Sequence, residues 1–184
     1  MRYFIAFLVT LGLILSLFFL LFHSSGKPKV PLTTKTLGSY ASTDAQVALT
    51  IDGPVNADQN HQAVRITVSR DDVTFEQIQG YQNTVVNLQN YANNQDAYVN
   101  FLLALAHAGF TKGDANPNHS DERGYCPLGD RYIFELKQDN NDLERYWTSS
   151  CGGPKTYLGN TGLTLALFQA QVPNYRDLAQ NAKL

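Results

Sequence analysis

Alternating apolar and polar residues predict a run of β-strands in the first half of the chain. Residues 45–51 and 63–69 place a branched aliphatic residue at every second position, which is the period of a half-buried strand. The Asp-Gly-Pro sequence at 52–54 is expected to end the first of them. Residues 73–79 and 84–91 are predicted to continue the sheet, because turn residues separate each segment from the next.

The segment that follows the second strand has a helical alternative. Thr74 and Gln77 fit a capping box. Val73 and Ile78 fit a hydrophobic staple, with Gly80 placed to close such a helix. We nevertheless predict a strand, because the segment is rich in β-branched and aromatic residues and follows a hairpin turn.

Residues 94–109 are predicted to form the main helix. Asn93 or Asn94 can cap its start, Asp96 favours the first turn, and Gly109 can close its end. The apolar residues recur at spacings of three and four and so share one face; they are Tyr98, Phe101, Leu102, Leu105 and Ala106. A second, shorter helix is predicted for residues 161–170, with a polar tail after it.

A second hairpin is predicted for residues 131–137 and 143–149. A turn centred just before Asn141 places Phe134 opposite Trp147 on the apolar face. Tyr146 then lies on the polar face, where a tyrosine ring is suited to bind a protein or glycan partner. We therefore take Tyr146 as a candidate binding residue.

The two cysteines flank this hairpin. Cys126 precedes its first strand and Cys151 follows its second, so a bend at residues 127–129 can bring the two together. A catalytic cysteine needs a nearby base and a lowered pKa, and the sequence around Cys151 supplies neither signature. We predict a disulfide bond between Cys126 and Cys151, which also favours an oxidising compartment.

The chain begins with an uncharged apolar run from Tyr3 to Phe22, which is long enough as a helix to cross a bilayer core of about 30 Å. A cleaved signal peptide is the alternative, with 24–26 (Ser-Ser-Gly) as its small-residue site. We predict a transmembrane anchor at 1–23, an extended stalk at 24–43 rich in Ser, Thr, Pro and Lys, and a folded domain at 44–184.

The orientation signals disagree. Lysines at 27, 29 and 35 follow the run and by the positive-inside rule favour a cytoplasmic C-terminus. The short basic start at Arg2 and the cysteine pair favour export. We expect a single-pass protein of the cell membrane with its C-terminal domain outside the cytoplasm. The predicted architecture is α+β: the transmembrane helix, then an antiparallel sheet (a meander plus the disulfide-stapled hairpin) packed by one or two helices.

Composition and motifs exclude several chemistries. Charged residues make up 16% of the chain, the net charge is −2, and the basic residues are scattered, which argues against nucleic-acid binding. The sequence contains no HExxH, paired CxxC, GxSxG or phosphate-loop motif, and it indicates no cofactor and no catalytic residue set.

A weak calcium signature lies in the long loop after the main helix. Asp114, Asn116 and Asn118 occupy the first, third and fifth positions of an EF-hand-like loop. The sixth position is His119 instead of Gly, and the twelfth is Tyr125 instead of Glu. A polar loop with Asx turns explains the same residues, so no metal site is expected.

Several short segments together resemble uncharacterised envelope proteins of candidate-phyla bacteria of the Saccharibacteria type. They are 122–129 (ERGYCPLG), 131–133 (RYI), 146–152 (YWTSSCG), 167–169 (LFQ) and 173–175 (PNY), with the leading anchor. The resemblance spans roughly residues 45–175 and implies a bacterial cell surface. It carries no activity and no functional residue, and on such a surface the glycan-acceptor triplet at 118–120 has no role.

These features predict a membrane-anchored extracytoplasmic interaction or structural module of the cell envelope. Its expected partners are the membrane and an envelope protein or glycan. One alternative is a surface hydrolase that pairs a cleft carboxylate with His61 or His119, although loop histidines are usually only solvated. Another is an accessory subunit of a membrane complex, with Gly12 and Ser16 as a helix-contact pair.

Overall fold

A computed structural model describes residues 35–184 except 115, 116, 140, 181 and 183. The predicted anchor and the first part of the predicted stalk lie outside these residues. Within the described part of the chain, no helix combines the length and the hydropathy that crossing a bilayer requires.

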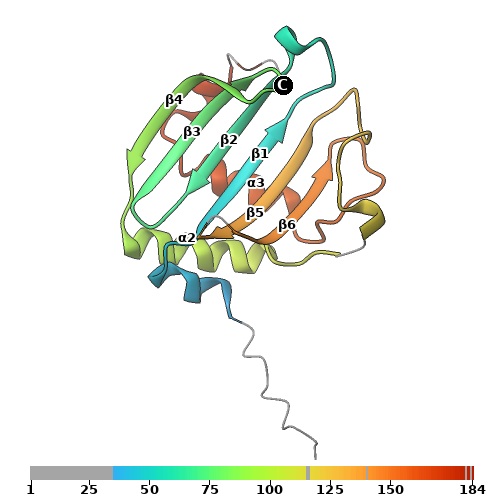
Figure 1. The fold of residues 1–184 in the computed structure, drawn as a ribbon. Helices are drawn as coiled ribbons and strands as arrows, with labels where there is room; N and C mark the ends of the chain where they lie inside the picture. The colour runs from blue at the N-terminus through green and yellow to red at the C-terminus, as the bar shows by residue number, and fades with distance from the viewer. Residues whose placement is uncertain (1–34, 115–116, 140, 181, 183) are drawn as a thin grey trace, which may run out of the picture. The chain divides into compact units, whose positions relative to one another are not determined.

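The domain is built on one antiparallel sheet of six strands in the order β4-β3-β2-β1-β5-β6 (Figure 1). The strands are β1 (Gln46–Asp52), β2 (Gln62–Val68), β3 (Asp72–Gln79), β4 (Thr84–Ala92), β5 (Arg131–Gln138) and β6 (Asn141–Ser149). β1 to β4 form a meander, and the chain then returns to place β5 beside β1. This confirms the predicted antiparallel sheet, including a strand where a helix was the alternative.

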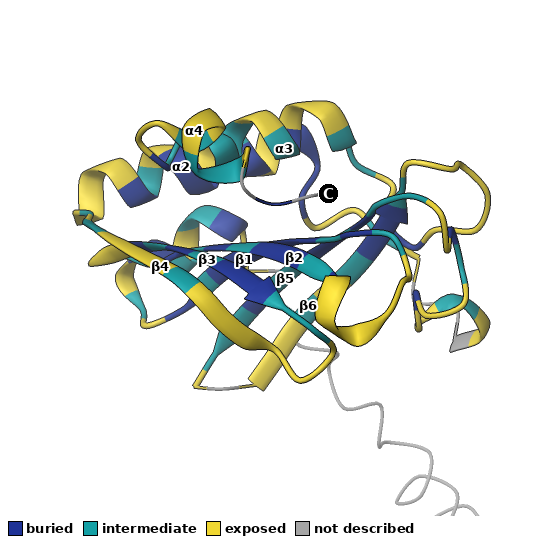
Figure 2. Cartoon of the chain, turned by 90° about the horizontal axis from the view of Figure 1, so that it is seen from above, coloured by how far each residue is buried: buried dark blue, intermediate teal, exposed yellow. Residues whose placement is uncertain are grey.

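Helices cover one face of the sheet (Figure 2). They are α2 (Gln95–Ala108), α3 (Thr161–Gln169) and α4 (Tyr175–Ala179); three short 3₁₀ turns, η1 (Leu37–Ser42), η2 (Asp58–Asn60) and η3 (Pro117–His119), complete the elements. The side chain of Asn94 caps α2 by accepting from the backbone N–H of Ala97 at 2.9 Å. Gly109 ends α2 in the left-handed conformation, with φ 80°. Both helix ends are therefore where the sequence predicted them.

The core lies between this face and the helices. The inward residues of β1 and β2 alternate as predicted, and Phe101, Leu102 and Leu105 of α2 pack onto them. Phe168 of α3 meets Phe101 edge to face, with ring centroids 5.3 Å apart. The other face of the sheet carries none of these helices (Figure 2).

The two ends of the domain differ from expectation. Residues 37–42 were predicted as part of an extended stalk, but they form η1, whose Leu37 and Ala41 are buried in the core beside α2. The tail after α3 was predicted to be only polar, but α4 follows there and Tyr175 packs edge-on against Phe75. Isolated apolar residues such as these are buried through tertiary contacts, so the hydrophobic periodicity of the sequence does not predict their burial.

The register of the second hairpin was predicted wrongly by one residue. The ladder pairs Ile133 with Trp147 and Phe134 with Tyr146. The turn lies one residue earlier than predicted, since Gln138 pairs with Asn141, and a bulge between Leu136 and Lys137 then shifts the pairing back by one, which leaves a net slip of one residue. A slip of one residue moves each side chain of one strand to the opposite face.

Trp147 and Tyr146 exchange faces as a result. Trp147 is fully buried on the helix-free side, where its ring stacks on Tyr125 and its Nε1 donates to the carbonyl of His119 at 2.6 Å. Tyr146 packs against the core instead of standing on the polar face.

Candidate functional site

A cleft of about 520 Å³ opens on the helix-free face of the sheet. Its floor is formed by side chains of β1, β2, β5 and β6. Three connections form its walls. They are the β1–β2 loop at 53–61, the β3–β4 turn at 80–83 and the segment at 122–130 that precedes β5. It lies within the size range of small-ligand sites.

An ion pair between the central strands forms one end of the floor. Asp52 and Arg131 are direct partners in the β1–β5 ladder and so point to the same face. Nη2 of Arg131 donates to Oδ2 of Asp52 at 2.7 Å and to the carbonyl of Gly53 at 2.8 Å. The Arg131 side chain is only 3% exposed, and that of Asp52 is 24% exposed. A Cβ at Gly53 would lie 2.7 Å from the carbonyl oxygen of Gln62, so only glycine fits between the strands there.

His61 completes a cluster of three charged groups. Its Nε2 lies 2.9 Å from Oδ1 of Asp52, and its Nδ1 lies 3.2 Å from the carbonyl oxygen of Pro54. Both neighbours are acceptors, and only the imidazolium form donates from both ring nitrogens. His61, whose side chain is 5% exposed, can therefore donate to both acceptors only when both of its ring nitrogens carry a proton.

Tyr81 joins two walls of the cleft around this histidine. Its ring stacks on the His61 ring, with centroids 4.1 Å apart and planes inclined by 13°. Its hydroxyl donates to the carbonyl of Asn56 at 3.0 Å, and its backbone N–H donates to Oδ1 of Asp58 at 2.8 Å. The β1–β2 loop and the β3–β4 turn are thus held together on both sides of His61.

A second group of ion pairs forms the other end of the floor. Arg145 on β6 binds both carboxylate oxygens of Glu122, at 2.8 and 2.9 Å. Glu135 lies 3.7 Å from Arg145 and 3.2 Å from Nζ of Lys137. Burial by itself lowers the pKa of Arg145, but its carboxylate partners outweigh burial and raise it. The carboxylates of Glu122 and Glu135 are thus both paired with cations, and they share Arg145.

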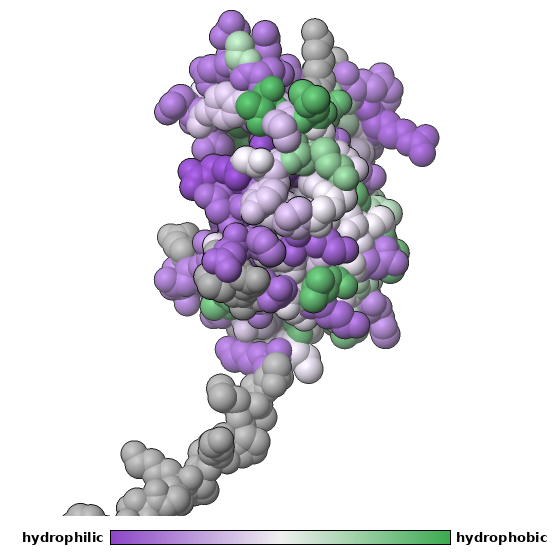
Figure 3. Space-filling model, turned by 90° about the vertical axis from the view of Figure 1, so that its right-hand side faces the viewer, coloured by the Kyte–Doolittle hydropathy of each residue, from purple (hydrophilic) through white to green (hydrophobic). Residues whose placement is uncertain are grey.

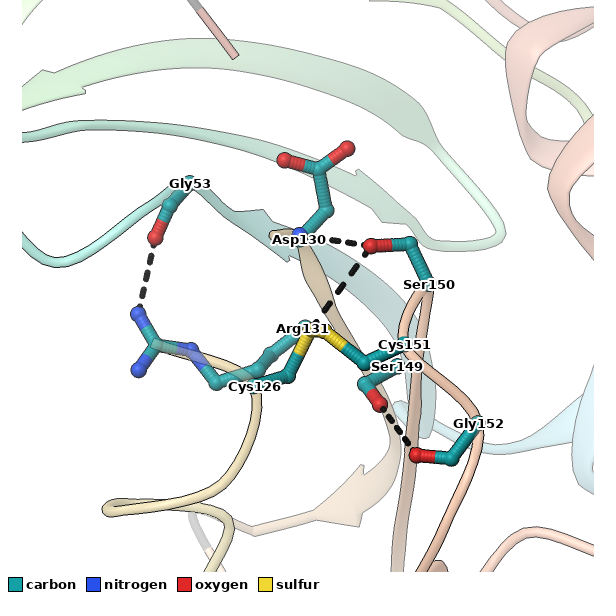
Figure 4. Close-up of a disulfide and its surroundings, with 8 residues drawn as sticks. All are labelled: Gly53, Cys126, Asp130, Arg131, Ser149, Ser150, Cys151 and Gly152. Atoms are coloured by element: carbon teal, nitrogen blue, oxygen red, sulfur yellow. Dashed lines mark hydrogen bonds between the residues drawn. A yellow bond between two sulfur atoms is a disulfide. The ribbon is translucent and has the colours of Figure 1, made fainter. Parts of the chain in front are cut away.

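The disulfide Cys126–Cys151 fixes the third wall (Figure 4). It joins the segment before β5 to the end of β6, as predicted, with the two Cα atoms 5.6 Å apart. Ser150 lies beside it and accepts from the backbone N–H of Asp130 at 2.9 Å. The carbonyl of Pro127, next to Cys126, accepts from the N–H of Val55 at 2.7 Å. Through this hydrogen bond of Pro127, the disulfide-bonded segment is therefore joined to the β1–β2 loop, which also lines the cleft.

Tyr146 does not contribute to this site. Its ring lies under the loop at Gly113, where a Cβ would come within 2.0 Å of it, and its hydroxyl donates to Glu144. Burial, with a further contribution from Glu144, raises the pKa of Tyr146 to about 12. The predicted polar face of Tyr146 was wrong, because the ring packs against the core, while its binding role stays a prediction.

The calcium signature stays a prediction. Asn116 lies outside the described residues. The backbone of Asp114 donates to the carbonyl of Thr156 at 2.8 Å, and Asn118 lies in η3. The residues that the structure describes contain no group of three or more His, Cys, Asp or Glu side chains placed to hold a metal ion.

The sequence interpretation missed the His61 cluster. His61 was expected to be solvated because polar residues surround it, yet it is 4% exposed. The signal was the position of three charged residues at strand ends: Asp52 ends β1, His61 precedes β2 and Arg131 begins β5. Recognising it requires knowing that β5 returns beside β1.

The cluster is better suited to hold charge than to transfer protons. Both nitrogens of His61 are within bonding distance of protein acceptors, so neither is placed to accept a proton from a substrate. His119 is not among the residues that line the cleft; its ring meets Tyr125 edge-on at 6.4 Å.

The side of the molecule seen in Figure 3 shows hydrophilic and hydrophobic side chains intermixed, with the apolar ones in small separate groups. A comparison of the chain with protein-family models and with curated proteins finds no match.

Proposed function

We propose that the protein is a membrane-anchored extracytoplasmic interaction module of the cell envelope, and that its cleft on the helix-free sheet face is the binding surface. The observation that carries this proposal is the buried Asp52–His61–Arg131 cluster at the floor of the cleft. Buried charges cost free energy unless each is compensated, so their placement in an open cleft favours a role in recognition.

The structure of the walls supports binding by a preformed surface. Tyr81 ties two walls together and the disulfide holds the third, so the cleft changes little in shape when a ligand enters. A ligand that meets a prearranged site loses less free energy to ordering. An anchor and an oxidising compartment are consistent with such a disulfide-stapled receptor.

A surface hydrolase is the second candidate, because His61 does lie beside a carboxylate in a cleft. The interaction module is favoured over it because both nitrogens of His61 have protein partners. A hydrolase requires a group free to receive the proton of the attacking nucleophile.

Site-specific photo-crosslinking in intact cells tests the proposal. A crosslinking residue is placed in the full-length protein at Val55 on the cleft wall or, as a control, at Leu103 on α2; the two side chains are 48% and 49% exposed. We expect envelope adducts from Val55 that disappear when His61→Gln is added, and none of these adducts from Leu103. Identical adducts from both positions, or none from either, would overturn the proposal.

A thiol-labelling experiment tests the compartment. A membrane-impermeant reagent is added to intact cells before and after reduction. We expect Cys126 and Cys151 to react only after reduction, because the disulfide joins them and the domain is outside. Free thiols that react only after lysis would place the domain in the cytoplasm.

A further inference from the structure

The charges at the floor of the cleft do not balance locally. Two buried basic side chains, those of Arg131 and His61, share one carboxylate, that of Asp52. One oxygen of Asp52 accepts from His61 and the other accepts from Arg131. With His61 protonated, one positive charge is left over, and buried charge is normally compensated by a partner.

Hydrogen bonds show the same imbalance. A guanidinium has five N–H donors. The acceptors of Arg131 at Asp52 and Gly53 both bind Nη2, and its buried Nε has no hydrogen-bond partner in the described residues. Arg131 therefore has more donors than the neighbouring residues satisfy.

Neighbouring carboxylates offset the charge of this cluster only in part. Glu122 is bound by Arg145 through both oxygens, and Glu135 lies between Arg145 and Lys137. Asp130 is next to Arg131 in the chain but points away from the guanidinium (Figure 4), and its carboxylate accepts from the Tyr132 hydroxyl.

The remaining cations of the cleft lie nearer its rim. Arg123 is 84% exposed on the side chain and pairs with Asp121, while Arg65 is 35% exposed and lies 3.8 Å from Glu76. Exposed arginines around a concave surface raise the local concentration of anions. The cleft thus has buried basic side chains in its floor and one strongly exposed arginine, Arg123, in its lining.

We propose that the floor of the cleft, at Arg131 and His61, binds an oxyanion group, a carboxylate or a phosphate, of the ligand. Nε of Arg131 is the donor without a protein partner, whereas both nitrogens of His61 already face protein acceptors, so the guanidinium supplies the hydrogen bond to the oxyanion. The cleft volume of about 520 Å³ exceeds that of a simple ion, so the oxyanion is one group of a larger molecule. This inference rests on the proposed function and names the chemistry that the same cleft recognises.

The test measures the melting temperature of the purified full-length protein in a low-chloride buffer. Sodium acetate and sodium phosphate are the probes, and sodium chloride at equal ionic strength is the control. A ligand that binds only the folded state raises the melting temperature with concentration. Phosphate also stabilises folded proteins by exclusion from their surface, so only the part of the shift that His61→Gln reduces counts as binding. We expect such a part with acetate or phosphate.

Three variants connect the effect to the cluster. His61→Gln removes one cation and should weaken the apparent affinity about tenfold. Asp52→Asn removes the carboxylate that competes for both cations, so the added anion should stabilise it more than the wild type. Asp71→Asn changes the net charge equally at the exposed turn between β2 and β3, where Asp71 pairs with Arg70, and should respond like the wild type.

The outcomes separate the two proposals. Acetate and phosphate acting no more strongly than chloride, or a response that His61→Gln leaves unchanged, would overturn the oxyanion site. If Asp52→Asn does not fold, the comparison of the anion response of the wild type with that of His61→Gln still tests the oxyanion site. If the anions have no effect but Val55 still gives adducts, the oxyanion site is wrong and the interaction module stands. If the anions stabilise the protein but no adducts form, the oxyanion site stands and the interaction module is wrong.

Discussion

Nε2 of His61 donates to Oδ1 of Asp52 across 2.9 Å, although the whole β1–β2 loop separates the two residues in the chain. Asp52 also holds Arg131, so it is the common partner of two buried cations. Asp52→Asn should therefore destabilise the protein by about 2–3 kcal/mol, because it leaves both cations without a counter-charge. Urea unfolding monitored by circular dichroism measures this loss.

Asp71→Asn is the matched control for this change. Asp71 also pairs with an arginine, Arg70, but its side chain is 76% exposed at the opposite end of β2. An exposed ion pair contributes little, so we expect a change below about 0.5–1 kcal/mol. Equal losses in the two variants would show that the Asp52 cluster is not a stabilising unit.

The disulfide should stabilise both the fold and the cleft. It closes a loop with a sequence separation of 25, which corresponds to about 3.5 kcal/mol in the chain-entropy treatment. We expect reduction, or the double substitution Cys126→Ser and Cys151→Ser, to lower the unfolding free energy by about that amount. Urea unfolding with and without reductant measures it, and the double variant, which has no disulfide to reduce, must not respond to reductant.

Local patterns in the sequence were sufficient to predict the elements that are determined by residues close together in the chain. The strands of the meander follow from side-chain alternation, and the boundaries of α2 follow from Asn94 and Gly109. The disulfide followed from the positions of Cys126 and Cys151 around one hairpin. In each case the deciding residues are close in the chain or flank a single turn.

Features that depend on distant contacts were not visible. The Asp52–Arg131 pair exists because β5 lies beside β1, a pairing across most of the domain sequence. The faces of Tyr146 and Trp147 depend on a one-residue shift of the β5–β6 ladder, which an Asp/Asn-rich turn does not specify. The candidate site was missed for these reasons, since every part of it is formed by strand ends that meet only in the folded sheet.

Tyr98 should contribute a specific hydrogen bond within the core. Its side chain is fully buried, and its hydroxyl donates to the carbonyl of Ala45 at 2.8 Å. Tyr98→Phe leaves a buried carbonyl without this donor, so we expect a loss of about 1–2 kcal/mol in urea unfolding. Tyr40→Phe is the control, because Tyr40 is only half-buried; it should change stability by less than about 0.5 kcal/mol.

Tyr146 should make the protein sensitive to alkaline pH. Burial, followed by its hydrogen bond to Glu144, raises its pKa from 10 to about 12 in the folded state. Between these two values the unfolded chain releases the phenolic proton while the folded protein retains it, so stability must fall as pH rises from about 10 to about 12. Unfolding free energies measured at pH 9 and pH 11 should therefore differ less in Tyr146→Phe than in the wild type. Tyr40→Phe serves again as the control for the removal of a tyrosine hydroxyl. An undiminished slope in Tyr146→Phe would mean that this hydroxyl ionises at its ordinary pH, as it would if the ring stood on the polar face.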